Sequence, residues 1–275
     1  MTVIAMTREI GSLSTDVAAG LAARLRLRII RFEDVADRVA RRLGVDPASL
    51  LRYFDGSASF LERWKIDRRK LLGYTAEEVL HLAQRGNVLI KGWGAATLLR
   101  NVPGVISVRV CAPMAFRVRV MMDRLGSTDA GAVQARIERE DDARARTIRA
   151  YFGVEEEDAR VHHLVLNTER LSVDACVNAI AELAEIRRYN ETARTRSALA
   201  DKLVEVKINS AFVERISPSM APLGVQASVT GGRITLDGMT CSGGLRRHAE
   251  RIARMAAGAF PIDNRIVSVP SRGRL

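Results

Sequence analysis

The stretch Val3-Ile4-Ala5-Met6-Thr7-Arg8-Glu9-Ile10-Gly11-Ser12-Leu13-Ser14-Thr15-Asp16 near the start of the chain decides the fold. Its first five residues are a short apolar run that predicts a buried strand, and the pattern from about residue 15 to residue 25 predicts a helix. When a strand passes through a tight turn into a helix, backbone N–H groups and the helix N-terminus face the same point and favour an anion there. The turn from Arg8 to Asp16 is therefore a candidate phosphate-binding loop.

The composition of this turn also has a purely structural explanation. The turn contains one glycine, two serines and one threonine but no lysine, so it does not match the Walker A pattern. Ser14, Thr15 and Asp16 are all good helix N-caps, and composition alone favours an ordinary capped helix over a phosphate site. The candidate nucleotide-binding residues of the turn are Arg8, Gly11, Ser12, Ser14 and Thr15.

Beyond the turn, short apolar strands alternate with helices as far as about residue 186. Strands are predicted at residues 28–30, 88–90, 105–110 and 161–166. Helices are predicted at 15–25, 33–43, 95–100, 114–125, 128–150 and 172–186, with several more between 46 and 85 that break near Asp55-Gly56 and Gly73. This alternation predicts an α/β fold with a parallel sheet covered by helices. Ligands bind beyond the C-terminal ends of such strands, so Lys91 to Ala95, Cys111 to Arg117 and Asn167 to Arg170 are further loops of interest.

The pattern changes after a charged segment at residues 187–197, which predicts a linker. A helix at 198–216 precedes strands at 225–229 and 233–239, with Thr230-Gly231-Gly232 as the hairpin turn between them. A helix at 245–257 and a strand at 263–269 complete the order α-β-β-α-β, and we interpret Gly238 as a strand bend or close-approach residue. We expect one domain at residues 1–187, a linker at 188–197 and a small α/β domain at 198–270.

The net charge of +11 favours an anionic partner, and much of the excess is arginine, whose planar guanidinium suits phosphate. A GC-rich genome would also raise the arginine content without any functional reason. Charge is the only support for nucleic-acid binding, because no basic sheet with interleaved aromatic residues predicts base stacking. A nucleotide, a nucleic acid or a lipid headgroup would all fit the charge, and nucleic-acid binding has the weakest support.

The remaining composition excludes several classes of protein. The three cysteines lie far apart and the four histidines have no zinc spacing, so we expect reduced thiols and no metal site made by these residues. We interpret His162-His163 as the entry to a strand. There is no apolar run of about 18 residues, and Arg8 and Glu9 interrupt the apolar N-terminus. We therefore expect a cytoplasmic protein with neither a transmembrane segment nor a signal peptide.

Two further groups of residues are candidate phosphate or nucleotide sites. Gly92-Trp93-Gly94 follows a strand in a loose Gly-x-Gly arrangement, which is a weak signal. Arginines are frequent between residues 117 and 149, and arginine-bearing helices can clamp phosphoryl groups. Acidic residues alternate with these arginines, so a solvated helix with i,i+4 ion pairs explains the same pattern and is favoured by the residues alone.

Five segments, in this order and spacing, form a specific pattern: Thr7 to Ser12, Gly86 to Ile90, Val108 to Pro113 with Arg117, Asp141 with Arg144 to Gly153, and Leu164 to Thr168 with Leu171-Ser172. On these segments the chain resembles, over about residues 1–187, the cytidylate kinase-like family, a branch of the P-loop nucleoside monophosphate kinases. The resemblance implies phosphoryl transfer from ATP, with Mg²⁺, to a nucleoside monophosphate such as CMP. It implies catalytic roles for Arg117, Asp141 and Arg144, with the two arginines on phosphates from the lid side, and it places Gly11 and Ser12 on the ATP phosphates. Gly92 and Gly94 join the nucleotide-binding candidates.

The chain departs from this family where phosphate would bind. The family usually continues Gly-Ser-Gly-Gly-Arg where this chain has Gly11-Ser12-Leu13-Ser14-Thr15, so two glycines and a basic residue are missing. It often has Asp where this chain has Arg31, and Gly-Arg-Gly where this chain has Gly92-Trp93-Gly94. These changes weaken backbone approach and charge neutralisation, on which phosphoryl transfer depends. An arginine from the lid side or Lys91 is a candidate substitute. An active kinase and a catalytically degenerate sensor or scaffold both remain open.

Residues from about 197 to 270 resemble a BON domain. The resemblance rests on the predicted strand at 225–229, the Gly231-Gly232 turn, Ile234 to Gly238 and the helix from Arg246 to Ala257. It implies a binding module for a phospholipid surface or a protein partner. Four arginines of that helix either face lipid phosphates or form the wet side of an amphipathic helix, which is the favoured explanation; they are Arg246, Arg247, Arg251 and Arg254.

Overall fold

The structure is a computed structural model of the 275-residue chain. It describes residues 2–55, 57–59, 64, 66–92, 94–152, 154–155, 158–186, 189, 193–216, 224–240 and 243–269. Several positions named in the sequence analysis lie outside the described residues: Gly56, Trp93, Gly153, Cys241, and residues 187, 188 and 190–192 of the predicted linker. The contacts between Cα atoms divide the chain into two compact units, one of Met1–Ile66 and Arg85–Thr195 and the other of Asp67–Gln84 and Arg196–Leu275.

The first unit is built on a five-stranded parallel sheet with the order β2-β3-β1-β4-β5. The strands are β1 (Val3–Arg8), β2 (Arg28–Ile30), β3 (Val88–Lys91), β4 (Val105–Cys111) and β5 (Leu164–Asn167). The chain leaves β1 for the far edge at β2, returns to β3, and then crosses to β4 on the other side of β1. A crevice at such a reversal is where open α/β sheets bind ligands, so the carboxyl ends of β1, β3 and β4 are where a site is expected. The predicted α/β class with a parallel sheet is confirmed.

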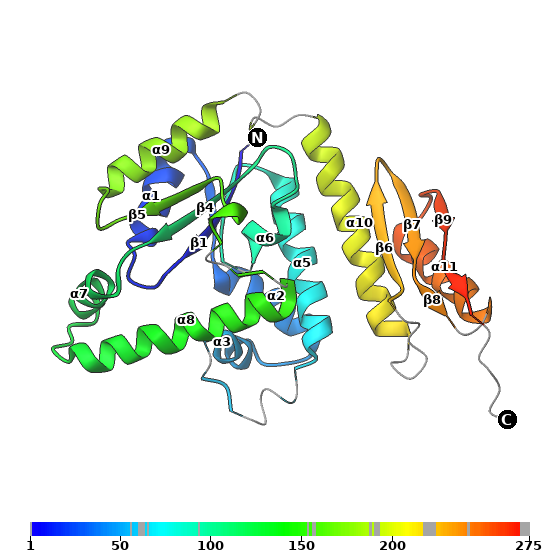
Figure 1. The fold of residues 1–275 in the computed structure, drawn as a ribbon, viewed down its shortest axis with the longest axis horizontal. Coiled ribbons are helices and arrows are strands. Elements are labelled where there is room, and N and C mark those ends of the chain that lie inside the picture. The colour runs from blue at the N-terminus through cyan, green and yellow to red at the C-terminus, as the bar shows by residue number, and fades with distance from the viewer. Residues whose placement is uncertain are drawn as a thin grey trace. The chain divides into compact units, whose positions relative to one another are not determined.

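Helices cover this sheet and extend from its carboxyl edge (Figure 1). Helix α1 (Ser14–Leu25) packs against α9 (Val173–Glu185), and together they bury one apolar cluster with residues of β1, β4 and β5. Helix α6 (Ala95–Leu99) packs against β1 and β4, while α2 (Phe32–Leu43) packs against α3 (Pro47–Asp55). Helices α7 (Met114–Leu125) and α8 (Ala130–Phe152) pack on each other around a small cluster that includes Ile10 of the β1–α1 turn.

The entry to β5 differs from the prediction. Residues Ala159–Val161 form a 3₁₀ turn that Asp158 caps, so β5 begins only at Leu164. Between them, His163 donates its backbone N–H to the Ser107 carbonyl over 2.8 Å, and its ring Nδ1 accepts from the Ser107 N–H over 3.0 Å. The interpretation of the histidine pair as a strand entry is confirmed, because these bonds join the chain to β4 just before β5 begins.

The second unit contains a helix from the middle of the sequence. Helix α5 (Arg68–Arg85) runs without a break through Gly73, so the predicted break there is wrong. A Cβ atom at Gly73 would lie 2.3 Å from Ser210 Oγ, which shows that the glycine admits helix α10 (Ala193–Arg215). Tyr74 also donates its hydroxyl to Glu214 of α10 over 2.6 Å. All of α5 except its last residue therefore belongs to the unit that α10 opens.

The rest of the second unit follows the predicted order, except that the strands predicted at 233–239 and 263–269 are each divided into two. The strands are β6 (Gln226–Thr230), β7 (Arg233–Asp237) and β9 (Ile262–Asn264) in one sheet, with β8 (Met239–Thr240) and β10 (Val267–Ser268) as a separate pair; helix α11 is Gly243–Ala257. The hairpin between β6 and β7 is confirmed, and the N–H groups of Gly231 and Gly232 donate to the Asp201 carboxylate over 2.7 and 3.0 Å. Helix α10 begins at Ala193, so residues 193–197 of the predicted linker belong to the helix instead.

The close-approach interpretation of Gly238 leads to a test of the second unit. Gly238 has a φ of +137°, and a Cβ atom there would lie 2.6 Å from the Cα atom of Val225. Gly238→Ala is expected to lower the free energy of unfolding by about 3 kcal/mol, because backbone strain adds to a clash with atoms that cannot rotate away. Urea denaturation monitored by circular dichroism measures the change.

Gly258→Ala is the matched control. Gly258 also has a positive φ, of +71°, but nothing lies within 4 Å of the position of its Cβ atom. Its substitution is expected to cost only about 1 kcal/mol. Equal losses for the two variants would contradict the close-approach role of Gly238.

Candidate functional site

The β1–α1 turn, residues Glu9 to Leu13, lies at the carboxyl end of the central strand. Gly11 has a φ of +79° and Leu13 a φ of +52°, so a leucine occupies a left-handed conformation that suits glycine. Ser12 is buried, and its hydroxyl lies 2.7 Å from the Glu9 carbonyl and 3.1 Å from the Val110 carbonyl. Its side chain therefore closes the turn and joins it to β4. Thr168, just after β5, donates its hydroxyl to the Ser12 carbonyl over 2.9 Å.

Gly11 is required by its neighbour as well as by its φ. A Cβ atom at Gly11 would lie 2.6 Å from the carbonyl oxygen of Arg117 in α7. The glycine therefore lets the first turns of α7 approach the backbone of the β1–α1 turn. The family resemblance predicted that Gly11 lies beside a phosphate. In the structure, the side of Gly11 on which a Cβ atom would stand faces the backbone of Arg117.

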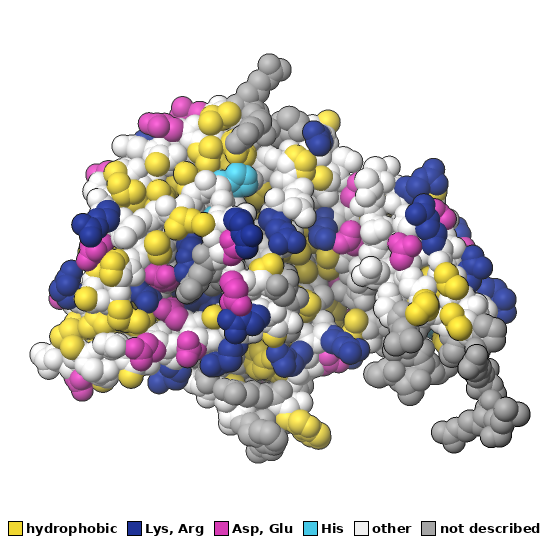
Figure 2. Space-filling view, viewed as in Figure 1, with side chains coloured by type: hydrophobic (Ala, Val, Ile, Leu, Met, Phe, Trp, Pro, Cys, Tyr) yellow, Lys and Arg dark blue, Asp and Glu magenta, His cyan; other side chains and the backbone are white. Residues whose placement is uncertain are grey.

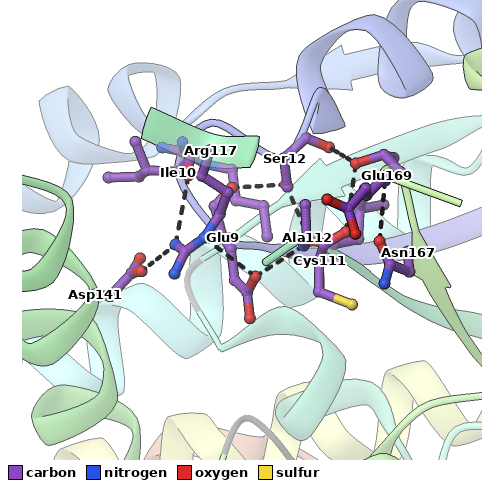
Figure 3. A network of polar contacts seen from close by, with 12 residues as sticks. Glu9, Ile10, Ser12, Cys111, Ala112, Arg117, Asp141, Asn167 and Glu169 are labelled. Carbon is purple, nitrogen blue, oxygen red and sulfur yellow. Dashed lines mark hydrogen bonds and ion pairs between the residues drawn. The ribbon is translucent and has the colours of Figure 1, made fainter. Parts of the chain in front are cut away.

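A cluster of buried charges joins the turn to β4, α7 and α8 (Figure 3). Glu9 accepts from Arg109 over 2.7 Å and from the backbone N–H of Ala112 over 3.0 Å. Arg117 Nε lies 3.6 Å from the same carboxylate, while its Nη1 bonds to Asp141 and lies 3.5 Å from the Ile10 carbonyl. The side chains of Arg109 and Arg117 are only 7% and 9% exposed. Two of the catalytic candidates, Arg117 and Asp141, are thus in direct contact, and Arg117 Nε is buried without a hydrogen-bond partner among the described residues.

Arg144 of α8 reaches the other side of the turn. Its Nη1 donates to the carbonyl oxygen of Arg8, and it lies 3.5 Å from Asp141 Oδ1. Burial, and next the neighbouring Arg144 guanidinium, lower the pKa of Arg8 below its usual value. Two guanidinium groups therefore lie close together at the end of β1, where an anion would stabilise both.

Lys91, the last residue of β3, is a further cation at this edge. Its Nζ donates to the hydroxyl of Thr15, in the first turn of α1, over 3.0 Å. Burial first, and then the charges of Arg8 and Arg124, lower the pKa of Lys91 to about 8. Glu33 and Asp16 oppose this shift. The ammonium group thus lies among charges of both signs, and burial and the two arginines together outweigh the two carboxylates.

Gly92 and Gly94 lie in the turn that connects β3 to α6. Gly92 has a φ of +80° and donates its N–H to the Met6 carbonyl over 2.9 Å. Gly94 has a φ of +63° and occupies the N-cap position of α6. Both glycines are explained by backbone conformation, and they lie beside Lys91 at the carboxyl edge.

The structure thus brings the predicted site residues to one edge of the first unit, on both sides of the β1–α1 turn. The sequence did not single out Glu9, Arg109 or Thr168 as site residues. Glu9 and Arg109 were visible only as part of family-like segments, and their contact depends on β1 and β4 being neighbours. Within the described ranges no group of three or more His, Cys, Asp or Glu side chains is placed to hold a metal ion.

Charge on the surface is mixed in the view of Figure 2, where Lys and Arg side chains alternate with Asp and Glu. In α8 the ion pairs Arg136–Glu140 and Arg146–Asp142 have the i,i+4 spacing. The solvated-helix explanation therefore applies to these arginines, whereas Arg144 of the same helix turns toward the β1–α1 turn. None of the described helices combines the length and the apolar character needed to cross a bilayer.

Comparison with known proteins gives the first unit its relatives. Residues 3–170 match the model of the cytidylate kinase-like family. The chain is 29% identical over 187 residues to a cytidylate kinase of Staphylothermus marinus, an alignment that covers 67% of this chain and 97% of the relative. It is 30% identical over 177 residues to a cytidylate kinase of Aeropyrum pernix, covering 64% and 95%. An uncharacterized protein from Eubacterium ventriosum has a similar fold, with a TM-score of 0.52, 18% identity, and coverage of 68% of this chain and 99% of that one.

The buried charge cluster predicts a large stability effect at Glu9. Glu9→Ala leaves the guanidinium groups of Arg109 and Arg117 buried without this carboxylate, so the free energy of unfolding should fall by about 3–5 kcal/mol. Glu155→Ala is the control, because it removes the exposed partner of Arg149, whose side chain is 62% exposed. Such surface pairs contribute about 0–1 kcal/mol. Urea denaturation of both variants compares the two losses, and a Glu9 loss below about 1 kcal/mol would mean that the cluster does not hold the turn.

Proposed function

Because the chain belongs to the cytidylate kinase-like family, we propose that it transfers a phosphoryl group from ATP to a nucleoside monophosphate of the CMP type. In this reaction the bond between the γ-phosphorus and the bridging oxygen of ADP breaks. A new bond forms between that phosphorus and a phosphate oxygen of the acceptor, so ADP and a nucleoside diphosphate leave.

The observation that carries this proposal is the attachment of two lid-side arginines to the β1–α1 turn. Arg117 and Arg144 come from α7 and α8, and both contact backbone carbonyls of the strand end and turn. Phosphoryl transfer needs positioning and positive charge around the phosphates rather than a covalent intermediate. Arg144, whose side chain is 22% exposed, is the arginine of this pair with more access to a phosphate.

Asp141 has a positioning role in this proposal. Its carboxylate contacts both Arg117 and Arg144 and so fixes the distance between two cations that would otherwise repel each other. Glu9 does the same for Arg109 and Arg117. The carboxylates orient the guanidinium groups, and the guanidinium groups stabilise the charge that develops on the transferred phosphate.

Magnesium is expected with the nucleotide. Mg²⁺ prefers phosphate and water oxygens, so it would be held mainly through the phosphates of the nucleotide. When bound, the ion would neutralise phosphate charge during transfer.

A second candidate is a kinase-like domain that binds a nucleotide or acts as a scaffold without turnover. Two features favour it: Leu13 replaces a glycine in the turn, and the open side of Gly11 faces the Arg117 backbone rather than a ligand. Both reduce the room in which a phosphate chain can approach backbone N–H groups.

The C-terminal part of the chain is proposed to be a BON-like binding module for a phospholipid surface or a protein partner. Its support is the order α10-β6-β7-β8-α11-β9-β10 and the resemblance in sequence. On α11, Arg254 pairs with Glu250 and Arg246 donates to the Asn264 carbonyl, so these two arginines already have partners within the unit.

The kinase proposal is tested by measuring ADP release from Mg-ATP with and without CMP. We expect release to depend on CMP, and we expect Arg144→Ala to lower kcat by about 100-fold, the usual effect of removing one preorganised donor to a transition state. Arg146→Ala is the matched control, because Arg146 lies on the same helix with its side chain 68% exposed and should leave kcat unchanged.

Three results would contradict the kinase proposal. CMP-independent ADP release would mean that CMP is not the acceptor, and calorimetric binding of Mg-ATP without any release would favour the sensor. Absence of binding of either nucleotide by the folded protein would remove the kinase and the nucleotide sensor and leave only the scaffold.

A further inference from the structure

We propose that Lys91 is the phosphate-binding cation of this site, supplied from β3 in place of a basic residue in the β1–α1 turn, and that it takes up a proton when a nucleotide binds. This inference rests on the proposed nucleotide binding and adds a residue and a proton to it. In this chain the cation thus comes from strand β3 and not from the β1–α1 turn.

The first observation is the place of the ammonium group. The turn and the first residues of α1 run from Glu9 to Thr15 without any lysine or arginine. Lys91 Nζ lies 3.0 Å from Thr15 Oγ1, so its charge stands at the first turn of α1, where the helix N-terminus already favours an anion. Strand order explains how this is possible, because β3 is the direct neighbour of β1 and Lys91 pairs with Met6.

The second observation is the electrostatic setting of Lys91. Arg8 on β1 and Arg124 on α7 repel its positive charge, while Glu33 on α2 and Asp16 on α1 attract it. Asp16 is itself paired with Arg124 over 2.5 Å, so its charge is shared. Burial and the two arginines prevail and hold the pKa of Lys91 at about 8. A buried ammonium beside like charges opposes folding, which is the setting of a group retained for a ligand.

This pKa determines whether nucleotide binding takes up or releases a proton. Near pH 8 about half of the Lys91 groups are neutral in the free protein. A phosphate chain beside the ammonium favours the charged form and returns the pKa toward its ordinary value. At pH 8.5 binding should therefore take up roughly 0.5–0.8 of a proton per site, because the phosphates of the nucleotide are already ionised at that pH.

The same lowered pKa bears on stability. The unfolded chain binds more protons at this lysine than the native protein between about pH 8 and the ordinary lysine range, so the contribution of Lys91 to stability rises with pH across that window. Below pH 8 the charged ammonium is a cost to the fold. Lys91→Met should accordingly raise the melting temperature at pH 7, which also shows that this variant folds.

The test uses the full-length chain and calorimetric titration with Mg-ATP at pH 8.5, in two buffers that differ in enthalpy of ionisation. The wild type should take up the fraction of a proton given above. Lys91→Met should bind about 10- to 100-fold more weakly, the usual loss for a hydrogen bond to a charged group, and should take up no proton. Lys91→Arg should restore much of the affinity but not the proton uptake, because arginine remains charged throughout.

Lys207→Met is the matched control, since Lys207 is a partly buried lysine of α10 in the second unit. It should change neither affinity nor proton uptake. Equal binding by Lys91→Met and wild type, or proton uptake that survives in Lys91→Met, would overturn the proposal. If the wild type binds Mg-ATP with proton uptake but transfers nothing to CMP, the Lys91 role stands and the kinase function fails; if the wild type binds no nucleotide, both fail.

Discussion

The carboxylate of Glu9 is the group on which the candidate site depends. It stands one residue beyond the central strand and accepts from a side chain of β4, from the backbone N–H after β4, and lies within ion-pair distance of α7. One continuous segment, from Arg109 of β4 to Arg117 of α7, is thus fixed to the start of a turn about a hundred residues earlier in the chain. Because two of the partners are buried guanidinium groups, the carboxylate compensates a desolvation cost that neither arginine could bear alone. The carboxylate of Glu9 therefore holds the candidate site together, although it is not one of the proposed phosphate-binding groups.

The parts of the fold that follow from local sequence were predictable. The strand, turn and helix from Val3 to Leu25 and the Gly231-Gly232 hairpin each depend on residues within one short segment. The alternation of strands and helices also sufficed to predict a parallel sheet. Short-range patterns carry this information because hydrophobic periodicity and turn chemistry act between near neighbours.

The rest depends on strand order and on packing, which no single segment encodes. The contact of Glu9 with Arg109 exists because β1 and β4 are neighbours, and that of Lys91 with Thr15 because β3 lies on the other side of β1. Gly73 has the composition of a helix break, yet it lies inside α5 because its missing side chain makes room for Ser210. A glycine that permits close packing and a glycine that ends a helix are identical in sequence. The family resemblance indicated which residues belong to the site. It did not indicate that the Ser12 hydroxyl would bond to a backbone carbonyl, or that Gly11 would face the backbone of Arg117.

The membership of α5 in the second unit has a consequence for biosynthesis. Helix α5 ends at Arg85 and its partner α10 begins only at Ala193, so roughly a hundred residues must emerge from the ribosome before the two can pair. At about 5–20 residues per second this takes on the order of 5–20 seconds. During that interval the face of α5 around Gly73 and Tyr74 lacks its final neighbour, and such transiently uncovered surfaces attract chaperones or other nascent chains. Completion of this packing is therefore tied to a segment synthesised much later, and a chain that ends within residues 86–192 would have an uncovered helix.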